Sequence, residues 1–260
     1  MGEVEQAVDS YGVAIFTHGA ASIHFDDEGI AGGFPILLLA PGGMRSCNER
    51  WEIVPWNPRR ALAADYRLIG MDQRNAGRSS APIRPTDGWT TYRDDQLALL
   101  DHLGIERCHL VGMCIGGPFA LALLAAAPER FASALLLQPA GIDGNRSAYD
   151  EVYDGWQQEL SPSRPEVDEQ TWRSFKHNMW DGDFVLSVDR DQIREVAAPM
   201  LVAFGNDEWH PTSVSVEVAD LAPDCTVVER WKDEESLPEA DREFRAFLQS
   251  HTPTDLRCGS

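Results

Sequence analysis

The sequence has no apolar run of the length that a membrane-spanning helix needs, which is about 18 residues. It is also poor in basic residues, because 22 lysines and arginines stand against 42 aspartates and glutamates, for a formal net charge of −20. Affinity for a phosphate backbone comes from clustered Lys and Arg. We therefore expect neither a nucleic-acid partner nor a membrane partner.

Cysteine is scarce as well, and the five residues of this type are Cys47, Cys108, Cys114, Cys225 and Cys258. They form no C-x-x-C pair and lack the spacing to histidine that is typical of a metal site. The acidic start of the chain lacks the basic and apolar regions of a signal peptide. The sequence therefore predicts a cytoplasmic protein with free thiols and without a bound metal.

The most informative stretch that is present is residues 112–116, which read Gly-Met-Cys-Ile-Gly. An apolar run over 108–113 precedes it and a helix-like run over 117–127 follows it. This pattern predicts a strand, a tight turn and a helix, with Cys114 at the bend beside the helix amides. We therefore expect Cys114 to be a nucleophile, and the alternative is a small buried core cysteine.

Apolar runs bounded by turn residues alternate with helical patterns, which is typical of a largely parallel sheet with helices on both faces. The predicted strands are 13–17, 22–25, 36–40, 67–71, 108–113, 134–138, 200–204 and 226–230. The predicted helices are 58–66, 91–103, the run to residue 127, a segment after 211, and 238–249. Residues 142–198 break this alternation, so we expect a core of residues 1–141 and 199–260 and a helical cap of residues 142–198.

Four motifs in order resemble those of the α/β-hydrolase superfamily. They are Pro41-Gly42-Gly43 after the third predicted strand, Asp72-x-Arg74-x-x-Gly77-x-Ser79 after the fourth, the turn at Cys114, and Gly205-Asn206-Asp207 after the penultimate strand. The resemblance implies a mostly parallel eight-stranded sheet flanked by helices, with a short helical cap inserted after the sixth strand. Cysteine in place of the usual serine makes the turn similar to that of dienelactone hydrolases.

The same resemblance assigns roles to residues of this chain. The nucleophile is Cys114, the acid is Asp207, and the oxyanion hole consists of the amide of Ile115 and that of Gly43 or Met44. The superfamily's histidine is expected after the last strand, yet residues 231–238 contain none. We predict that His210, three residues beyond Asp207, takes this role, because nucleophile and base need only be close in space.

Alternatives remain open for the acid, the base and the pocket. Asp143, after the sixth predicted strand, is an alternative acid, and His177 in the expected cap is an alternative base. The predicted substrate pocket is lined by Trp156, Trp172, Trp180 and Trp209. These aromatics favour an apolar or aromatic small molecule, although packing of the cap against the core is the other interpretation.

The leading hypothesis is a cofactor-independent hydrolase that acts on a small ester, thioester or lactone through an acyl-thiol intermediate. A lyase, decarboxylase or cyclase that uses the same pocket without acyl transfer is the second hypothesis. A catalytically inert ligand-binding protein is the third. The oligomeric state stays open, with a homodimer among the alternatives.

Overall fold

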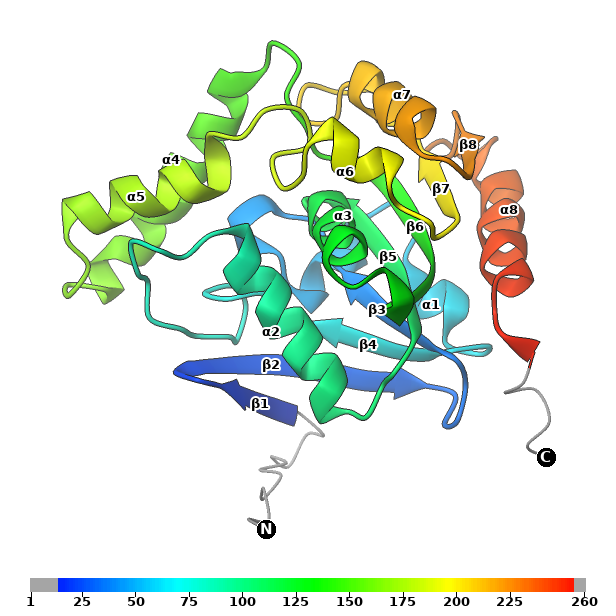
Figure 1. Cartoon of the computed structure of the whole chain (residues 1–260), viewed down its shortest axis with the longest axis horizontal. Coiled ribbons are helices and arrows are strands. Elements are labelled where there is room, and N and C mark those ends of the chain that lie inside the picture. The colour runs from blue at the N-terminus through cyan, green and yellow to red at the C-terminus, as the bar shows by residue number, and fades with distance from the viewer. Residues whose placement is uncertain (1–13, 255–260) are drawn as a thin grey trace.

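The computed structural model describes residues 14–254, and these form one sheet of eight strands (Figure 1). The strand order is β1-β2-β4-β3-β5-β6-β7-β8, and among these eight strands β2 alone runs opposite to the others. The strands are β1 (Ala14–His18), β2 (Ala21–Gly29), β3 (Pro35–Leu39), β4 (Arg67–Met71), β5 (Cys108–Cys114), β6 (Phe131–Pro139), β7 (Met200–Ala203) and β8 (Cys225–Val228). The predicted fold class is thereby confirmed.

Helices flank this sheet and connect its strands. They are α1 (Pro58–Leu62), α2 (Trp89–His102), α3 (Gly116–Ala126), α4 (Arg146–Leu160), α5 (Glu169–Trp180), α6 (Arg190–Arg194), α7 (Thr212–Leu221) and α8 (Leu237–Ser250), with short 3-10 turns at Gly43–Arg45, Asn48–Ile53, Pro128–Arg130 and Ser161–Ser163. The helix expected over 58–66 ends at Leu62, where a turn leads into β4. The strand expected over 22–25 continues to Gly29, because its acidic half pairs with β4. Val13, expected in the first strand, lies outside the described residues.

The central strands are apolar throughout because both faces of the sheet are covered. In β3, Leu37 and Leu39 pack into the layer that contains α2, α3 and α7. Ile36 and Leu38 point the other way, into the layer that contains α1 and α8. This two-residue alternation is the geometry of an extended strand. It makes the sheet a rigid platform whose carboxyl edge carries the loops.

The segment between β6 and β7, residues 140–199, is fully described and contains α4, α5 and α6 but no strand. In Figure 1, α4 and α5 lie side by side at the end of the molecule opposite α8. Their aromatic side chains pack on each other, and Trp89 of α2 donates a hydrogen bond of 2.9 Å to the Met179 carbonyl. We propose that this segment forms the cap expected from the sequence.

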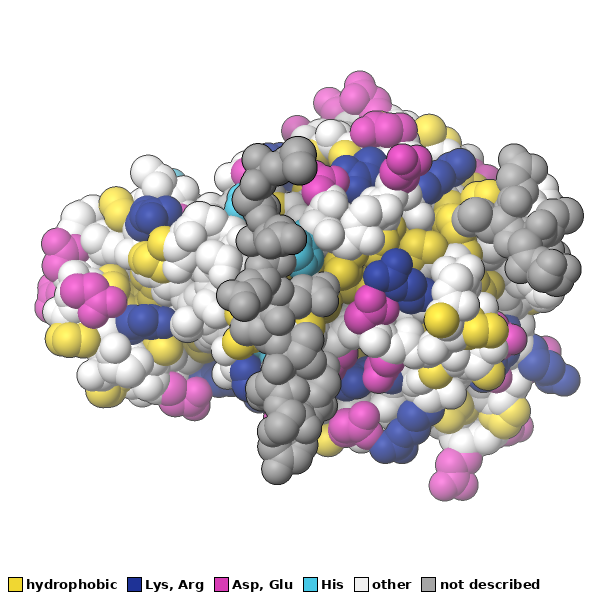
Figure 2. Space-filling view, turned by 90° about the horizontal axis from the view of Figure 1, so that it is seen from below, with side chains coloured by type: hydrophobic (Ala, Val, Ile, Leu, Met, Phe, Trp, Pro, Cys, Tyr) yellow, Lys and Arg dark blue, Asp and Glu magenta, His cyan; other side chains and the backbone are white. Residues whose placement is uncertain are grey.

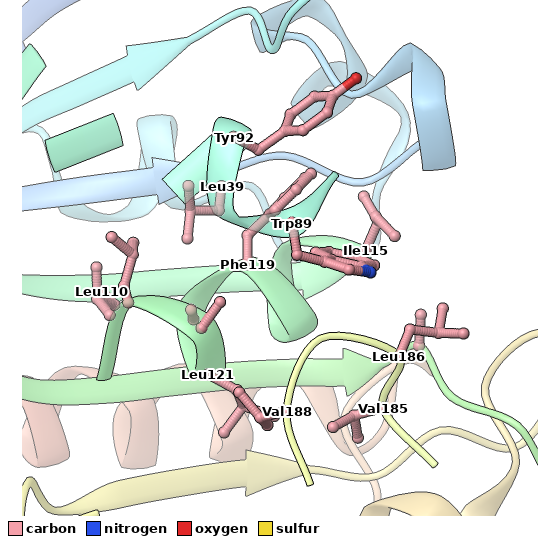
Figure 3. Packing of buried hydrophobic residues seen from close by; sticks show 14 of the residues in the cluster. Leu39, Trp89, Tyr92, Leu110, Ile115, Phe119, Leu121, Val185, Leu186 and Val188 are labelled. Carbon is pink, nitrogen blue, oxygen red and sulfur yellow. The ribbon is translucent and has the colours of Figure 1, made fainter. Parts of the chain in front are cut away.

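The start of α3 is packed tightly against the sheet and against α2. Figure 3 shows Ile115 and Phe119 beside Trp89 and Tyr92. The Phe119 ring centroid lies 5.2 Å from that of Trp89 and 5.4 Å from that of Tyr92. Burial of these large rings fixes the helix axis under the turn that carries Cys114.

A Gly116→Ala substitution tests this close approach, because a Cβ on Gly116 would lie 2.0 Å from the Leu39 carbonyl oxygen. We expect the free energy of unfolding, measured by urea denaturation, to fall by about 1–3 kcal/mol. The matched control is Gly155→Ala in α4, where the nearest atom, Arg45 Nη2, is 3.6 Å away. That variant is expected to gain up to about 1 kcal/mol from helix propensity. Equal stability of the two variants would contradict the packing described here.

Candidate active site

The turn between β5 and α3 holds Cys114 in a conformation that few residues adopt. Its φ is 57°, in the left-handed region that costs a non-glycine residue energy. Gly112 is required beneath it, since a Cβ there would lie 2.2 Å from the Gly116 carbonyl oxygen. The Ala140 amide donates a 3.0 Å hydrogen bond to the Cys114 carbonyl and ties the turn to β6. Neighbouring structure thus holds the thiol at the carboxyl edge of the sheet.

The Cys114 thiol lines a cavity of about 680 Å³ together with His210. Burial acts against ionisation of the thiol and is the largest influence on it. The opposing influences are the charge of His210, a polar interaction of its ring with the sulfur, and the backbone amides of Gly42 and Ile115. Together they outweigh burial and lower the pKa of the Cys114 thiol. Thiolate is the nucleophilic form of cysteine, so this site favours the reactive species.

His210 and Asp207 occupy the two ends of one tight turn after β7. The Asp207 carboxylate accepts a 2.6 Å hydrogen bond from His210 Nδ1 and a 3.0 Å bond from the His210 amide. His210 is buried, and its Nε2 has no hydrogen-bond partner of standard geometry within residues 14–254. Burial acts to lower the pKa of His210, but the Cys114 thiolate and Asp207 outweigh it and raise the pKa. The three groups therefore favour a thiolate paired with an imidazolium.

Contacts from three sides fix the position of this turn. A Cβ on Gly205 would lie 2.2 Å from the His210 carbonyl oxygen, so the backbone passes too closely for any side chain. Asn145 Nδ2 donates a 2.6 Å hydrogen bond to the Glu208 carbonyl. The Tyr149 hydroxyl donates one of the same length to the Trp209 carbonyl. The orientation of the imidazole is therefore set by the surrounding structure.

Residues 231–238, where the superfamily's histidine was expected, contact the other side of the same acid. Lys232 Nζ lies 3.5 Å from Asp207 Oδ2 and 2.7 Å from Asn206 Oδ1. Trp231 Nε1 donates a 2.9 Å hydrogen bond to the Phe204 carbonyl. Although burial raises it, the pKa of Asp207 falls to about 2 because of His210 and Lys232. Sequence reasoning missed Lys232, since nothing in the pattern connects it to Asp207.

The residues predicted for the oxyanion hole lie in different surroundings. Gly43 and Ile115 line the cavity beside Cys114. The side chain of Met44 is buried in the hydrophobic core, and Met44 is not among the cavity-lining residues. The backbone of Gly42, which sequence reasoning did not single out, lines the cavity as well and helps to lower the pKa of the thiol. The sequence signal that could have identified Gly42 is the pair of adjacent glycines, Gly42 and Gly43. Their φ values of 120° and 58° both lie in the region that favours glycine.

The alternative acid and base lie away from the thiol. Asp143 is exposed, and its carboxylate accepts a hydrogen bond from Ser213 Oγ. His177 is exposed on α5 and pairs with Asp181 at 2.7 Å, one helical turn along. Neither residue lines the cavity that contains Cys114. The structure thus brings Asp207 and His210 together with the thiol and leaves these two outside.

The four predicted pocket tryptophans divide into two pairs. Trp180 and Trp209 line the cavity, and Trp209 is 46% exposed at its rim. Trp156 and Trp172 do not, because they pack edge to face between α4 and α5 with ring centroids 5.8 Å apart. Trp156 instead lines a neighbouring pocket with Arg45 and Arg50, and Trp172 packs between the helices. Sequence reasoning also missed three polar lining residues, Arg45, Arg50 and Gln138, which no motif marks.

The described surface carries charged side chains of both signs. On the face drawn in Figure 2, Lys and Arg side chains are interspersed with Asp and Glu. Residues 14–254 contain no group of three or more His, Cys, Asp or Glu side chains placed to hold a metal ion. Within the same residues, no helix has the length and apolarity required to cross a membrane.

Comparisons with known proteins agree with this architecture. A sequence profile of the alpha/beta hydrolase fold matches residues 35–210. The dihydrolipoyllysine-residue acetyltransferase component of an acetoin cleaving system from Pseudomonas putida is 39% identical over 124 residues, which are 48% of this chain and 32% of that protein. A 2-hydroxy-6-oxo-6-phenylhexa-2,4-dienoate hydrolase from Burkholderia cepacia is 29% identical over 144 residues, which are 55% and 49% of the two chains.

The matched regions therefore span less than half the length of these curated relatives. Among solved structures, a hydrolase from Pseudomonas aeruginosa superimposes with a TM-score of 0.68 at 20% identity, over 94% of this chain and 99% of that one. This likeness concerns the fold alone. Since the family profile covers most of the chain, from β3 to His210, the protein belongs to the alpha/beta hydrolase fold family.

Proposed function

We propose that the protein is a hydrolase of small esters, thioesters or lactones, with Cys114 as its nucleophile and an acyl-thiol intermediate. The observation that carries this proposal is the Asp207–His210 pair, joined at 2.6 Å, beside a thiol whose pKa is lowered. Nucleophile, base and orienting acid in this relation are the components that acyl transfer requires. Both steps below use groups of this chain and water.

In the first step, the Cys114 thiolate attacks the carbonyl carbon, and the π electrons move onto the carbonyl oxygen. The amides of Ile115 and of Gly42 or Gly43 would stabilise this oxyanion at the start of α3, where the helix dipole favours negative charge. As the oxyanion collapses, the leaving oxygen or sulfur departs and takes a proton from the His210 imidazolium. The product is a thioester on Cys114 and a neutral His210.

In the second step, neutral His210 removes a proton from water while the water oxygen attacks the thioester carbonyl. Collapse of this intermediate expels the Cys114 thiolate and releases the carboxylic acid. Asp207 holds Nδ1 of the ring throughout and stabilises the imidazolium that forms. The enzyme returns to the thiolate–imidazolium pair with which it began.

The cavity suggests the class of acyl group. Tyr149, Trp180, Trp209 and Val152 contribute an apolar wall to it. Tyr149 and Trp180 use their polar atoms internally, since the Trp180 indole donates to the Tyr149 carbonyl and the Tyr149 hydroxyl donates to the Trp209 carbonyl. An apolar or aromatic small molecule fits such a wall. The name of the Burkholderia relative, a hydrolase of a phenyl-substituted dienoate, supports the same class.

Intact mass spectrometry tests the proposal on the full chain. The protein is mixed with phenyl butanoate or S-phenyl butanethioate, and phenol or thiophenol release is followed at the same time. We expect a burst of product with one butanoyl adduct, which peptide mapping places on Cys114, and loss of both after iodoacetamide treatment. Turnover that survives alkylation without any adduct, or silence with every ester and thioester, would overturn the proposal.

A further inference from the structure

One polar side chain of the cavity has no task in the mechanism above. Gln138 lies in β6, next to the end of β5. The pairing of these strands passes from Met113 with Leu137 to Cys114 with Pro139, so Gln138 is an extra residue opposite this step. Such a bulge re-aims a side chain, and Gln138 accordingly lines the cavity with Cys114. Since adjacent strands lie about 5 Å apart, the backbone of Gln138 runs close to that of Cys114.

The backbone of Gln138 is strained to achieve this placement. Its φ is 41°, in the region that disfavours side chains larger than glycine. Outliers of this kind cluster at sites where ligands are held. The strain therefore marks Gln138 as a residue whose position is maintained by the surrounding fold.

The amide oxygen of Gln138 also lacks a hydrogen-bond partner within residues 14–254. The side chain is 7% exposed, and its Oε1 is buried with no hydrogen-bond partner within residues 14–254. Buried amide oxygens almost always accept a hydrogen bond, because leaving one unpaired is unfavourable. The neighbouring Tyr149 hydroxyl cannot supply the bond, since it donates to the Trp209 carbonyl. A molecule bound in the cavity that Gln138 lines would supply a donor.

We propose that Gln138 is a specificity-determining residue that recognises a hydroxyl group on the acyl part of the substrate, near the scissile carbonyl. This rests on the proposed function of Cys114. A hydroxyl both donates and accepts hydrogen bonds, so it matches a primary amide in either orientation of its oxygen and nitrogen. A site that offers such a group unpaired discriminates against the analogue that lacks the hydroxyl. The preferred substrates are therefore short 3-hydroxyacyl esters or thioesters.

A matched substrate pair tests this recognition on the full chain. Phenyl 3-hydroxybutanoate and phenyl butanoate differ by one oxygen atom, and phenol release gives kcat/KM for each. We expect the unmodified protein to prefer the hydroxylated ester by about tenfold, which is the scale of one hydrogen bond to a buried group. A Gln138→Met variant, which keeps the length of the side chain and removes its amide, is expected to lose this preference while retaining activity on phenyl butanoate.

Two further variants make the outcome unambiguous. Gln138→Glu keeps an acceptor at this position and is expected to retain part of the preference. Gln96→Met removes a buried amide that pairs with Gln73 at 3.0 Å, outside the cavity, and is expected to keep the full preference. Equal kcat/KM for both esters in the unmodified protein, or an unchanged ratio in Gln138→Met, would overturn this inference alone. Absence of turnover and of adduct with both esters would instead overturn the proposed function, and this inference with it.

Discussion

A Cys114→Ala variant is expected to lose ester hydrolysis by about 10⁴-fold or more, because no other group at the site can form the acyl intermediate. The cavity keeps its walls, since Cys114 contributes only a thiol to them. Initial rates with phenyl butanoate, together with intact mass after exposure to the ester, measure the effect. Thermal unfolding of the variant is the control, and it should change little.

A Cys114→Ser variant changes the nucleophilic atom from sulfur to oxygen and leaves the surrounding site unchanged. A serine hydroxyl needs the neighbouring base to become nucleophilic, and His210 is placed to provide this. We therefore expect Cys114→Ser to retain more activity than Cys114→Ala. Retention of full activity by the alanine variant would mean that the reaction occurs elsewhere or without a thiol adduct.

A His210→Gln variant is expected to lose about 10²–10⁴-fold in kcat, which is the usual contribution of a general base. The same change should raise the pKa of the Cys114 thiol, because the charge of His210 beside the sulfur works to lower that pKa while burial raises it. In the unmodified protein, the rate of alkylation by iodoacetamide should therefore reach its plateau at a lower pH than in the variant. A pH series of alkylation rates measures this shift directly.

Asp207→Asn is the matched comparison for His210→Gln. It preserves the shape of the turn but removes the carboxylate that raises the pKa of His210. A smaller loss of kcat than in His210→Gln is expected, with the alkaline limit of activity moved to lower pH.

An alkylation profile that is the same in the unmodified protein and in His210→Gln would refute the thiolate–imidazolium pair.

The sequence predicted the fold well because its signals were local and repeated. Each buried strand was a continuous apolar run. The turn around Cys114 was marked by glycines at positions 112 and 116, where the close backbone leaves no room for a side chain. The pairing of Asp207 with His210 was also open to prediction, because both lie in one stretch of four residues. The β-bulge that turns Gln138 into the cavity has no such signature, since it depends on the register between two strands.

The pocket walls were harder to predict because aromatic residues serve two purposes in amphipathic helices. Trp156 lies on α4 and Trp180 on α5, and both are buried, yet Trp180 lines the cavity and Trp156 does not. Only the docking of α4 and α5 on the core decides between them. The contact of Lys232 with Asp207 was equally hard to predict, because it joins segments that are 25 residues apart in the sequence.

The turn over residues 207–210 has a consequence for how this protein could diversify. An acid and a base that share four consecutive residues are aligned with each other by the turn itself, and the chain beyond β8 adds Lys232 as a further contact to the acid. The C-terminal segment is thereby freed from carrying a proton acceptor. Tags and fusions at that end should leave turnover intact, whereas a graft of the four-residue turn onto a related sheet would also need the contacts of Asn145, Tyr149 and Gly205 that fix it.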